Sequence, residues 1–174
     1  MKRLLHLTLP MAAAAMLWLS SCGQDVRNSS SEYHRVDPDG WSYADRLTFK
    51  PEHLDSVCEG SLVVGLRHEG DYPYSNLWLE ISYTDARDPL YPVGPVKDGK
   101  RRLRRPLRRD TVEIRLCDPY GAWTGRGIGT SFQVTDTVTD LVHASGTPVM
   151  VRHLMRSEML EGVNQVGLFF VPKS

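Results

Sequence analysis

Hydrophobic and polar residues alternate with a period of two along most of the chain. Over residues 77–83, every second residue is apolar and shares one face, beginning with Leu77 and Leu79. This alternation is typical of β-strands that bury one face. Strands are predicted at 47–50, 62–66, 77–83, 112–116, 149–155 and 166–171, with weaker candidates at 132–134 and 138–142.

Turn-forming residues separate these ranges. Glycine supplies positive φ and proline presets φ in tight turns, and such residues occur at 37–40, 69–71, 118–121 and 145–148. Seven or eight short strands with this spacing predict an all-β fold, an antiparallel β-sandwich that is jelly-roll-like. One short helix is also predicted near the C-terminus, because Ser157 can cap residues 158–161 and Gly162 can end them.

The N-terminal segment has the pattern of a secretory signal. Lys2 and Arg3 precede a mostly apolar run over residues 4–19, which is short for a membrane-spanning helix of about 20 residues. Small residues then lead to Cys22, and the sequence Leu-Ser-Ser-Cys resembles the cleavage box of bacterial lipoproteins. The resemblance implies that Cys22 carries acyl chains, palmitate among them, and begins the mature protein.

These features divide the chain into three predicted parts. Residues 1–21 form the signal peptide, residues 22–35 a lipidated flexible tether, and residues 36–174 a single β-sandwich domain. The lipid anchor predicts a protein held at a membrane. Some bacteria mark surface-exposed lipoproteins with a cluster of acidic residues after the cysteine, but here only Asp25 follows, after Gly23 and Gln24. This favours the periplasmic side, with exposure on the cell surface as the alternative.

Charge is balanced overall but uneven along the chain. The sequence has 21 basic and 21 acidic residues, so loss of Lys2 and Arg3 leaves a mature net charge of about −2. Eight basic residues crowd into positions 97–109. Candidate contacts for an anionic partner there are Arg101, Arg102, Arg104 and Arg105. That partner is a lipopolysaccharide phosphate, an anionic lipid or an acidic protein; the alternative is a solvated loop. Nucleic acid is not expected, because no aromatic residue interleaves the run.

Two cysteines besides Cys22 remain in a compartment that permits disulfides. Cys58 lies in a polar stretch and Cys117 ends a predicted strand. They form either a disulfide or two unpaired thiols, and the unpaired state is favoured. The histidines lack the short spacing of metal ligands, and His153 falls on an apolar strand face, as a core histidine does. With no G-x-S-x-G motif either, no metal, cofactor or enzymatic activity is expected.

The glycine-bearing segment at residues 125–129 superficially resembles a phosphate-binding loop. Such a loop needs a helix after it, so that N–H groups face the phosphates. Strand-like residues follow instead, and no lysine stands at the required position. The segment is therefore predicted to form a turn or bulge between strands.

Three stretches of the sequence carry a family resemblance. They are Leu66–His68 followed by Tyr72–Leu79, Leu116–Asp118 followed by Gly121–Gly129, and Met155–Val163 leading to Val166–Leu168. With the lipoprotein box and Trp41, these stretches resemble the GldH-type gliding motility lipoproteins of the Bacteroidota. The resemblance covers the chain from Trp41 to its end. Residues 85–109 depart from the family pattern, because they are longer, contain proline and are very basic.

The resemblance implies an outer-membrane lipoprotein that acts without catalysis. Its role would be that of an accessory or interaction factor of the gliding motility and type IX secretion apparatus, with envelope proteins of that machinery as partners. The alternative is a cell-envelope lipoprotein that binds carbohydrate. The family supplies no catalytic residues to carry over.

Aromatic residues supply the candidate interaction surface. Aromatic side chains bury large areas at protein interfaces, and they also stack on sugar rings. The candidate residues are Tyr72, Tyr74, Asn76, Trp78 and Trp123. The alternative is structural: the tyrosines close a loop, Asn76 caps its backbone, and the tryptophans fill the core.

Overall fold

The computed structural model describes residues 30–173, which form β-strands and no helix. In chain order the strands are β1 (Ser30–Arg35), β2 (Trp41–Ser42), β3 (Leu47–Phe49), β4 (Val57–Glu69), β5 (Asn76–Tyr83), β6 (Tyr91–Lys97), β7 (Lys100–Arg104), β8 (Arg108–Arg115), β9 (Arg126–Ile128), β10 (Ser131–Ala144), β11 (Val149–His153), β12 (Met159–Leu160) and β13 (Val163–Pro172). The prediction of an all-β fold is confirmed.

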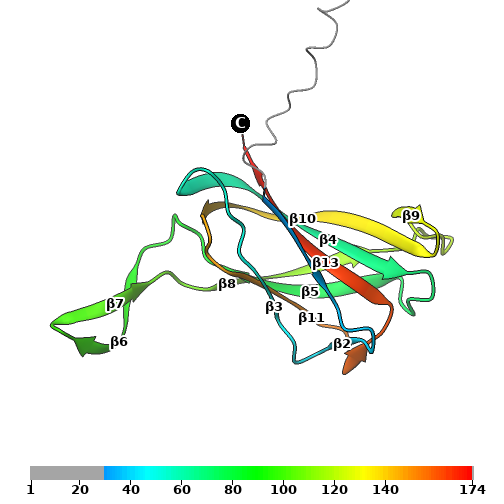
Figure 1. Ribbon diagram of the computed structural model, residues 1–174, viewed down its shortest axis with the longest axis horizontal. Coiled ribbons are helices and arrows are strands. Elements are labelled where there is room, and N and C mark those ends of the chain that lie inside the picture. The colour runs from blue at the N-terminus through cyan, green and yellow to red at the C-terminus, as the bar shows by residue number, and fades with distance from the viewer. Residues whose placement is uncertain (1–29, 174) are drawn as a thin grey trace, which may run out of the picture.

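Two antiparallel sheets make up the body of the molecule (Figure 1). The five-stranded sheet has the order β1-β13-β4-β10-β9, and the four-stranded sheet has the order β3-β11-β5-β8. One buried core draws side chains from both sheets, including Leu66 of β4, Leu79 of β5 and Phe170 of β13. Two sheets that share a core in this way fit the predicted sandwich. We call this part the two-sheet body.

The alternation seen in the sequence accounts for the strands at the centre of this body. In β5, Leu77, Leu79 and Ile81 are fully buried, whereas Trp78 is turned outward. Burying a leucine or isoleucine side chain contributes roughly 1.5–3 kcal/mol. A shift of the strand by one residue would exchange the two faces and lose that contribution. The hydrophobic period therefore fixes the register of β5.

The predicted helix near the C-terminus is wrong. Residues 159–160 form the short strand β12, which pairs with β2 so that Leu160 lies opposite Trp41. Both side chains are almost completely buried. A helix of five residues has little stability of its own, so pairing and burial against Trp41 determine the local structure. Gly162 ends the segment with φ of +78°, as a turn does.

The predicted tether is too long at its C-terminal end. Residues 30–35 form β1, which pairs along its whole length with β13. Small polar residues at the start of this segment suggested a flexible chain, but the pairing with β13 satisfies their backbone groups. The sheet therefore begins at Ser30, before the predicted boundary at residue 36. The signal peptide, Cys22 and residues 22–29 lie outside the described residues.

Cys58 and Cys117 are unpaired in the structure. Cys58 lies at the start of β4. Cys117 forms an isolated backbone β-bridge with Trp123, and the Trp123 ring packs against His68 near the end of β4. The ten residues from Cys58 to His68 span roughly 33 Å of extended strand. A disulfide between the two cysteines is therefore incompatible with this fold. Within residues 30–173, no helix is long and apolar enough to cross a membrane.

Candidate interaction surfaces

An aromatic cluster fills one end of the two-sheet body. The His68 ring, at the end of β4, lies 4.6 Å from Trp123, 5.7 Å from Tyr72 and 5.6 Å from Phe132, measured between ring centroids. His68 is fully buried, and its Nδ1 lies 2.9 Å from the Glu69 carbonyl oxygen. The structure thus brings Tyr72 and Trp123 into contact with the same buried histidine.

The structure gives Tyr72 and Asn76 local structural contacts. Tyr72 is 3% exposed, and its hydroxyl donates to the Asn76 carbonyl oxygen at 3.1 Å. Burial raises the pKa of the Tyr72 hydroxyl, and the neighbouring Tyr74 adds to the shift. The Asn76 side chain donates to Glu113 across the β5–β8 pair at 2.7 Å. Tyr72 is therefore a core residue that closes the 69–76 loop, as the structural alternative proposed.

Tyr74 and Trp78 present rings to solvent, each with 39% of its surface exposed. Tyr74 meets Tyr72 edge-on at 5.7 Å. Trp78 projects from the outer face of the four-stranded sheet, opposite Glu113 of β8. Among the described residues, no ring contact connects Trp78 with the aromatic cluster. The five predicted residues therefore do not form one exposed surface.

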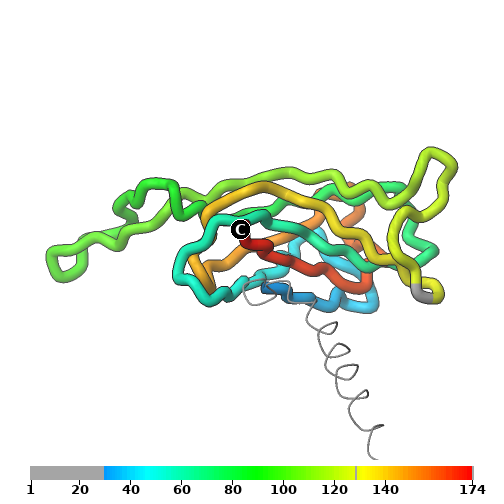
Figure 2. Tube along the Cα trace, turned by 90° about the horizontal axis from the view of Figure 1, so that it is seen from above, coloured from blue at the N-terminus to red at the C-terminus, as the bar shows by residue number. Residues whose placement is uncertain are grey.

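The basic segment forms a projecting β-hairpin instead of a loop. Strands β6 and β7 pair with each other and extend away from the two-sheet body, as Figures 1 and 2 show from two directions. Asp98 and Gly99 connect them, both with positive φ, as a tight two-residue hairpin turn requires. An Asp-Gly dipeptide between strand-like residues is a strong hairpin signal in a sequence, and it was the sign that sequence reasoning missed here.

Apolar side chains of the β6–β7 hairpin and its flanks are turned to solvent. Leu103 is 56% exposed, and the other large exposed side chains are Leu90, Tyr91, Val96 and Leu107. Arg101, Arg102 and Arg104 lie on the same hairpin, and their guanidinium groups form no hydrogen bond or ion pair with other residues in the range 30–173. Apolar and cationic groups are therefore presented together.

Ion pairs hold the base of the β6–β7 hairpin against the body. The Asp85 carboxylate is fully buried and binds the Arg87 guanidinium at 2.6 Å, with Arg108 at 3.8 Å. Arg108 also binds Asp88 through two hydrogen bonds of 2.5 and 2.7 Å. Burial alone would raise the pKa of Asp85, but its hydrogen bonds to Arg87 outweigh burial and lower it.

Arg105 belongs to this base. Its Nε donates to the Ala86 carbonyl oxygen at 3.3 Å. Of the four arginines predicted to contact an anionic partner, Arg105 therefore has a structural contact, while Arg101, Arg102 and Arg104 are free to engage one.

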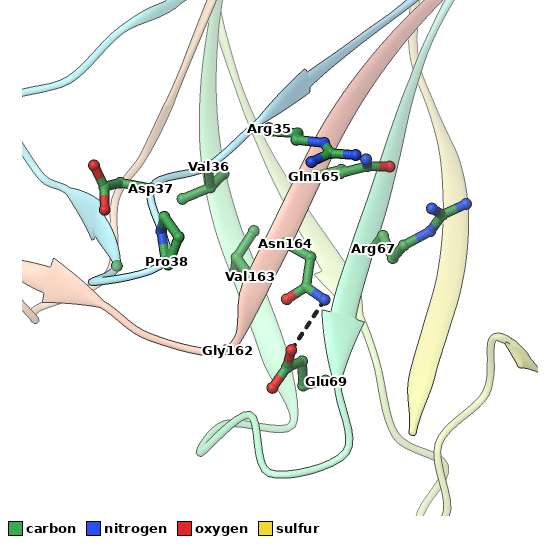
Figure 3. Close-up of a pocket in the computed structure, with 11 residues that line it drawn as sticks. Arg35, Val36, Asp37, Pro38, Arg67, Glu69, Gly162, Val163, Asn164 and Gln165 are labelled. Carbon is green, nitrogen blue, oxygen red and sulfur yellow. Dashed lines mark hydrogen bonds between the residues drawn. The ribbon is translucent and has the colours of Figure 1, made fainter. Parts of the chain in front are cut away.

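A cleft of about 360 Å³ lies beside the aromatic end (Figure 3). Loop residues 36–40, the end of β4 and the start of β13 form its walls. Asn164 donates to Glu69 across the cleft at 3.1 Å. No group of three or more histidine, cysteine or acidic residues in the described part of the chain is placed to hold a metal ion.

The segment from Gly125 to Gly129 forms the edge strand β9 and the tight turn into β10. Gly129 has φ of +66°. A Cβ atom at Gly125 would lie 2.6 Å from the Gln133 carbonyl oxygen, so this position requires glycine for close approach of the two backbones. The prediction of a turn or bulge is therefore confirmed only at Gly129, because residues 126–128 form a strand that was not predicted.

Stability should fall on acidification because three histidines are buried. Burial lowers the pKa values of His68, His143 and His153. The unfolded chain takes up these protons below pH about 6.5, while the folded chain resists protonation. The unfolding free energy is therefore level above that pH and falls below it, by up to about 1.4 kcal/mol per pH unit for each histidine.

Thermal melting at pH 7.5 and 5.0 checks this expectation. The lowered pKa values of Asp85 and Glu80 keep both carboxylates ionised in the folded chain throughout this interval, and in the unfolded chain they are mostly ionised as well, so they contribute little to the change. The melting temperature of the His143→Gln variant should fall less between pH 7.5 and 5.0, because the variant lacks one of the three buried protonation sites. An equal melting temperature at both pH values would contradict the expectation.

Comparison with known proteins places the sequence beside one family. The family model described as GldH lipoprotein matches residues 28–91 and 98–169, which is most of the chain. The unmatched residues 92–97 belong to β6. A protein of Christiangramia forsetii described as a gliding motility lipoprotein GldH homolog is 28% identical over 114 residues. That match covers 66% of this chain and 57% of the relative, so the chain spans just over half of the relative's length. No solved structure matches the chain.

Proposed function

Because the chain belongs to the GldH lipoprotein family, we propose that it acts in gliding motility as a non-catalytic accessory factor. In this proposal Cys22 anchors it to the outer membrane, facing the periplasm. It binds an envelope protein of the motility and type IX secretion machinery. The observation that carries the proposal is the β6–β7 hairpin, whose exposed side chains contact little of the body.

The composition of the hairpin fits binding to a protein. A two-stranded hairpin is marginally stable alone in water, and this one turns Val96 and Leu103 to solvent. Arginine is enriched at protein interfaces, and its planar guanidinium pairs with carboxylates in a bidentate manner. Apolar residues flanked by Arg101, Arg102 and Arg104 therefore suit a partner whose surface is apolar with an acidic rim.

Contacts at the base of the hairpin also favour binding to a protein partner. The Asp85–Arg87 and Asp88–Arg108 pairs hold its two ends near the body, and Arg105 adds a hydrogen bond to the backbone. An arm with a fixed base loses less conformational entropy on binding than a free loop. The base of the hairpin is thus preorganised for binding.

A pull-down from crosslinked membranes tests the proposal. The tagged full-length lipoprotein is expected to recover a stoichiometric envelope protein of the motility or secretion machinery. The Arg101→Gln, Arg102→Gln and Arg104→Gln triple variant should melt cooperatively at an unchanged temperature but recover that protein at least tenfold less. A triple variant with the same charge loss, Arg46→Gln, Arg115→Gln and Arg156→Gln, serves as the control. An empty pull-down, or equal recovery by both variants, would reject the proposal.

A further inference from the structure

A row of alternating arginine and glutamine residues crosses the outer face of the five-stranded sheet. Backbone register places Arg35 of β1 opposite Gln165 of β13, and Gln165 opposite Arg67 of β4. Arg67 in turn lies opposite Gln133 of β10, which lies opposite Arg126 of β9. Every strand of the sheet contributes one member. We call these five residues the arginine row.

Hydrogen bonds and a tyrosine ring order the centre of the arginine row. Arg67 donates to the Gln133 side-chain oxygen at 3.2 Å, and the Gln133 amide donates to the Tyr33 hydroxyl at 2.9 Å. Tyr33 comes from β1, so its ring extends across β13 and its hydroxyl meets the Gln133 side chain above β4. The ring therefore lies along the row.

Two glycines make room for this tyrosine. A Cβ atom at Gly167 would lie 2.7 Å from Cδ1 of Tyr33, and one at Gly65 would lie 3.2 Å from the Tyr33 hydroxyl. Phe169 meets the ring edge-on at 5.3 Å and fixes its far side. Tyr33 nonetheless keeps 37% of its surface exposed. The sheet thus carries an aromatic platform beside a line of cations.

The three arginines of the row lack acidic partners. None of Arg35, Arg67 and Arg126 forms an ion pair with another residue of the described range. Glu69 shares the neighbouring cleft, but its carboxylate accepts a hydrogen bond from Asn164, and Asp37 points away from Arg35 (Figure 3). The positive charge on this face is therefore available to a ligand.

The surface is hollowed toward both ends of the row. Arg35, Gln165 and Arg67 are among the residues that line the cleft of about 360 Å³, and Figure 3 shows them on three neighbouring strands. A second hollow, of about 550 Å³, is lined by Gln133 and Arg126. The arginine row runs from one hollow into the other.

We propose that the arginine row binds an acidic glycan, a carbohydrate chain that carries carboxylate or phosphate groups. Each guanidinium binds such a group through two parallel hydrogen bonds, and glutamine amides donate to and accept from sugar hydroxyls. The exposed face of Tyr33 stacks on a sugar ring. This surface is distinct from the β6–β7 hairpin, so the proposal does not depend on the protein partner.

The spacing of the row favours a chain over a small anion. Neighbouring strands lie about 4.8 Å apart, so successive arginines on alternate strands are roughly 10 Å apart and the row spans roughly 19 Å. One small anion reaches a single guanidinium, whereas a polymer with repeated charges reaches all three. An acidic peptide fits less well, because the inner strands already pair on both sides and offer no free backbone groups.

Binding of defined polymers to the full lipoprotein in detergent tests the proposal. The probes are alginate as a polymer of carboxylated sugars, phosphorylated dextran as a polymer of sugar phosphates, and neutral dextran. We expect binding to alginate, to phosphorylated dextran or to both, weakened by salt, and no binding to neutral dextran. The probe that binds identifies the anion as carboxylate or phosphate. Absence of binding to both acidic probes, or equal binding to dextran, would overturn the proposal.

Matched variants separate the arginine row from general electrostatic attraction. The Arg35→Gln, Arg67→Gln and Arg126→Gln triple variant should bind the acidic probe at least tenfold more weakly, with unchanged melting. The hairpin variant that lacks Arg101, Arg102 and Arg104 loses the same charge and should bind as the unaltered protein does. Equal weakening in both variants would overturn the proposal.

Competition distinguishes a glycan from an acidic peptide. Polyglutamate carries carboxylates without sugar rings, so it should compete at least tenfold less well than the acidic glycan. In the Tyr33→Leu variant, polyglutamate and the acidic glycan should compete more equally. Leucine fills the space above Gly167 and Gly65 but does not stack on sugars. Equal competition by polyglutamate against the unaltered protein would overturn the assignment to a glycan.

Discussion

The Cys22→Ala variant is expected in the soluble fraction of lysed cells, while the unaltered protein remains with the membranes. Cys22 ends the Leu-Ser-Ser-Cys box, and without its thiol no acyl chain can be attached. Each buried CH₂ of a lipid chain contributes about 0.8 kcal/mol, and stable anchoring needs more than one chain. Loss of the anchor should therefore move nearly all of the protein, as fractionation and immunoblotting would measure.

The other two cysteines supply the matched controls for this experiment. Cys58 lies in β4 and Cys117 just after β8, and both are unpaired, so the Cys58→Ala and Cys117→Ala variants should stay with the membranes. Labelling with a palmitate analogue should mark these two variants and leave Cys22→Ala unmarked. Cys22→Ala protein that remains in a carbonate-washed membrane pellet would contradict acyl anchoring at this residue.

The Phe170→Ala variant is expected to lose about 3–5 kcal/mol of unfolding free energy. Phe170 of β13 is fully buried, and its ring contacts His53 at 5.2 Å and His143 at 5.3 Å. Alanine would leave a cavity between these rings that the surrounding strands cannot fill. The melting temperature should fall by roughly 10 °C in a domain of this size.

Phe169 is the matched control, because it precedes Phe170 on the same strand and faces the other way. It is partly exposed and makes an edge-on contact with Tyr33. The Phe169→Ala variant should lose about 1 kcal/mol, which is the order of one aromatic pair. A similar loss in the two variants, measured by denaturant unfolding, would show that the assigned faces of β13 are incorrect.

The central strands could be predicted from the sequence because burial alone determines them. The alternation around Leu77 and Leu79 has one solution that hides the apolar face. The segment at residues 157–162 could not be predicted in this way, because its structure depends on Trp41, more than a hundred residues earlier. Capping signals at Ser157 and Gly162 favour a helix locally, and the tertiary pairing of Leu160 overrides them.

The candidate surfaces differ in how far the sequence reveals them. The basic run at residues 97–109 was visible as a cluster of charge, and its Asp98-Gly99 turn was a signal that could have identified the hairpin. The arginine row was not visible, because its members are scattered from Arg35 to Gln165. They become neighbours only once the strand order is known. Tyr72 and Trp123 show the opposite case, since their aromatic character suggested a surface, whereas packing against His68 buries Tyr72 and partly buries Trp123.

Site-specific photocrosslinking from the hairpin tests the central claim most directly. A photoreactive residue at Leu103, at the exposed part of β7, is expected to crosslink one discrete envelope protein in living cells. The same residue at Trp78, on the outer face of the four-stranded sheet, should give little or none of that product. Absence of a crosslink at Leu103, or an equal yield of the same product at Trp78, would contradict a partner-binding role for the hairpin.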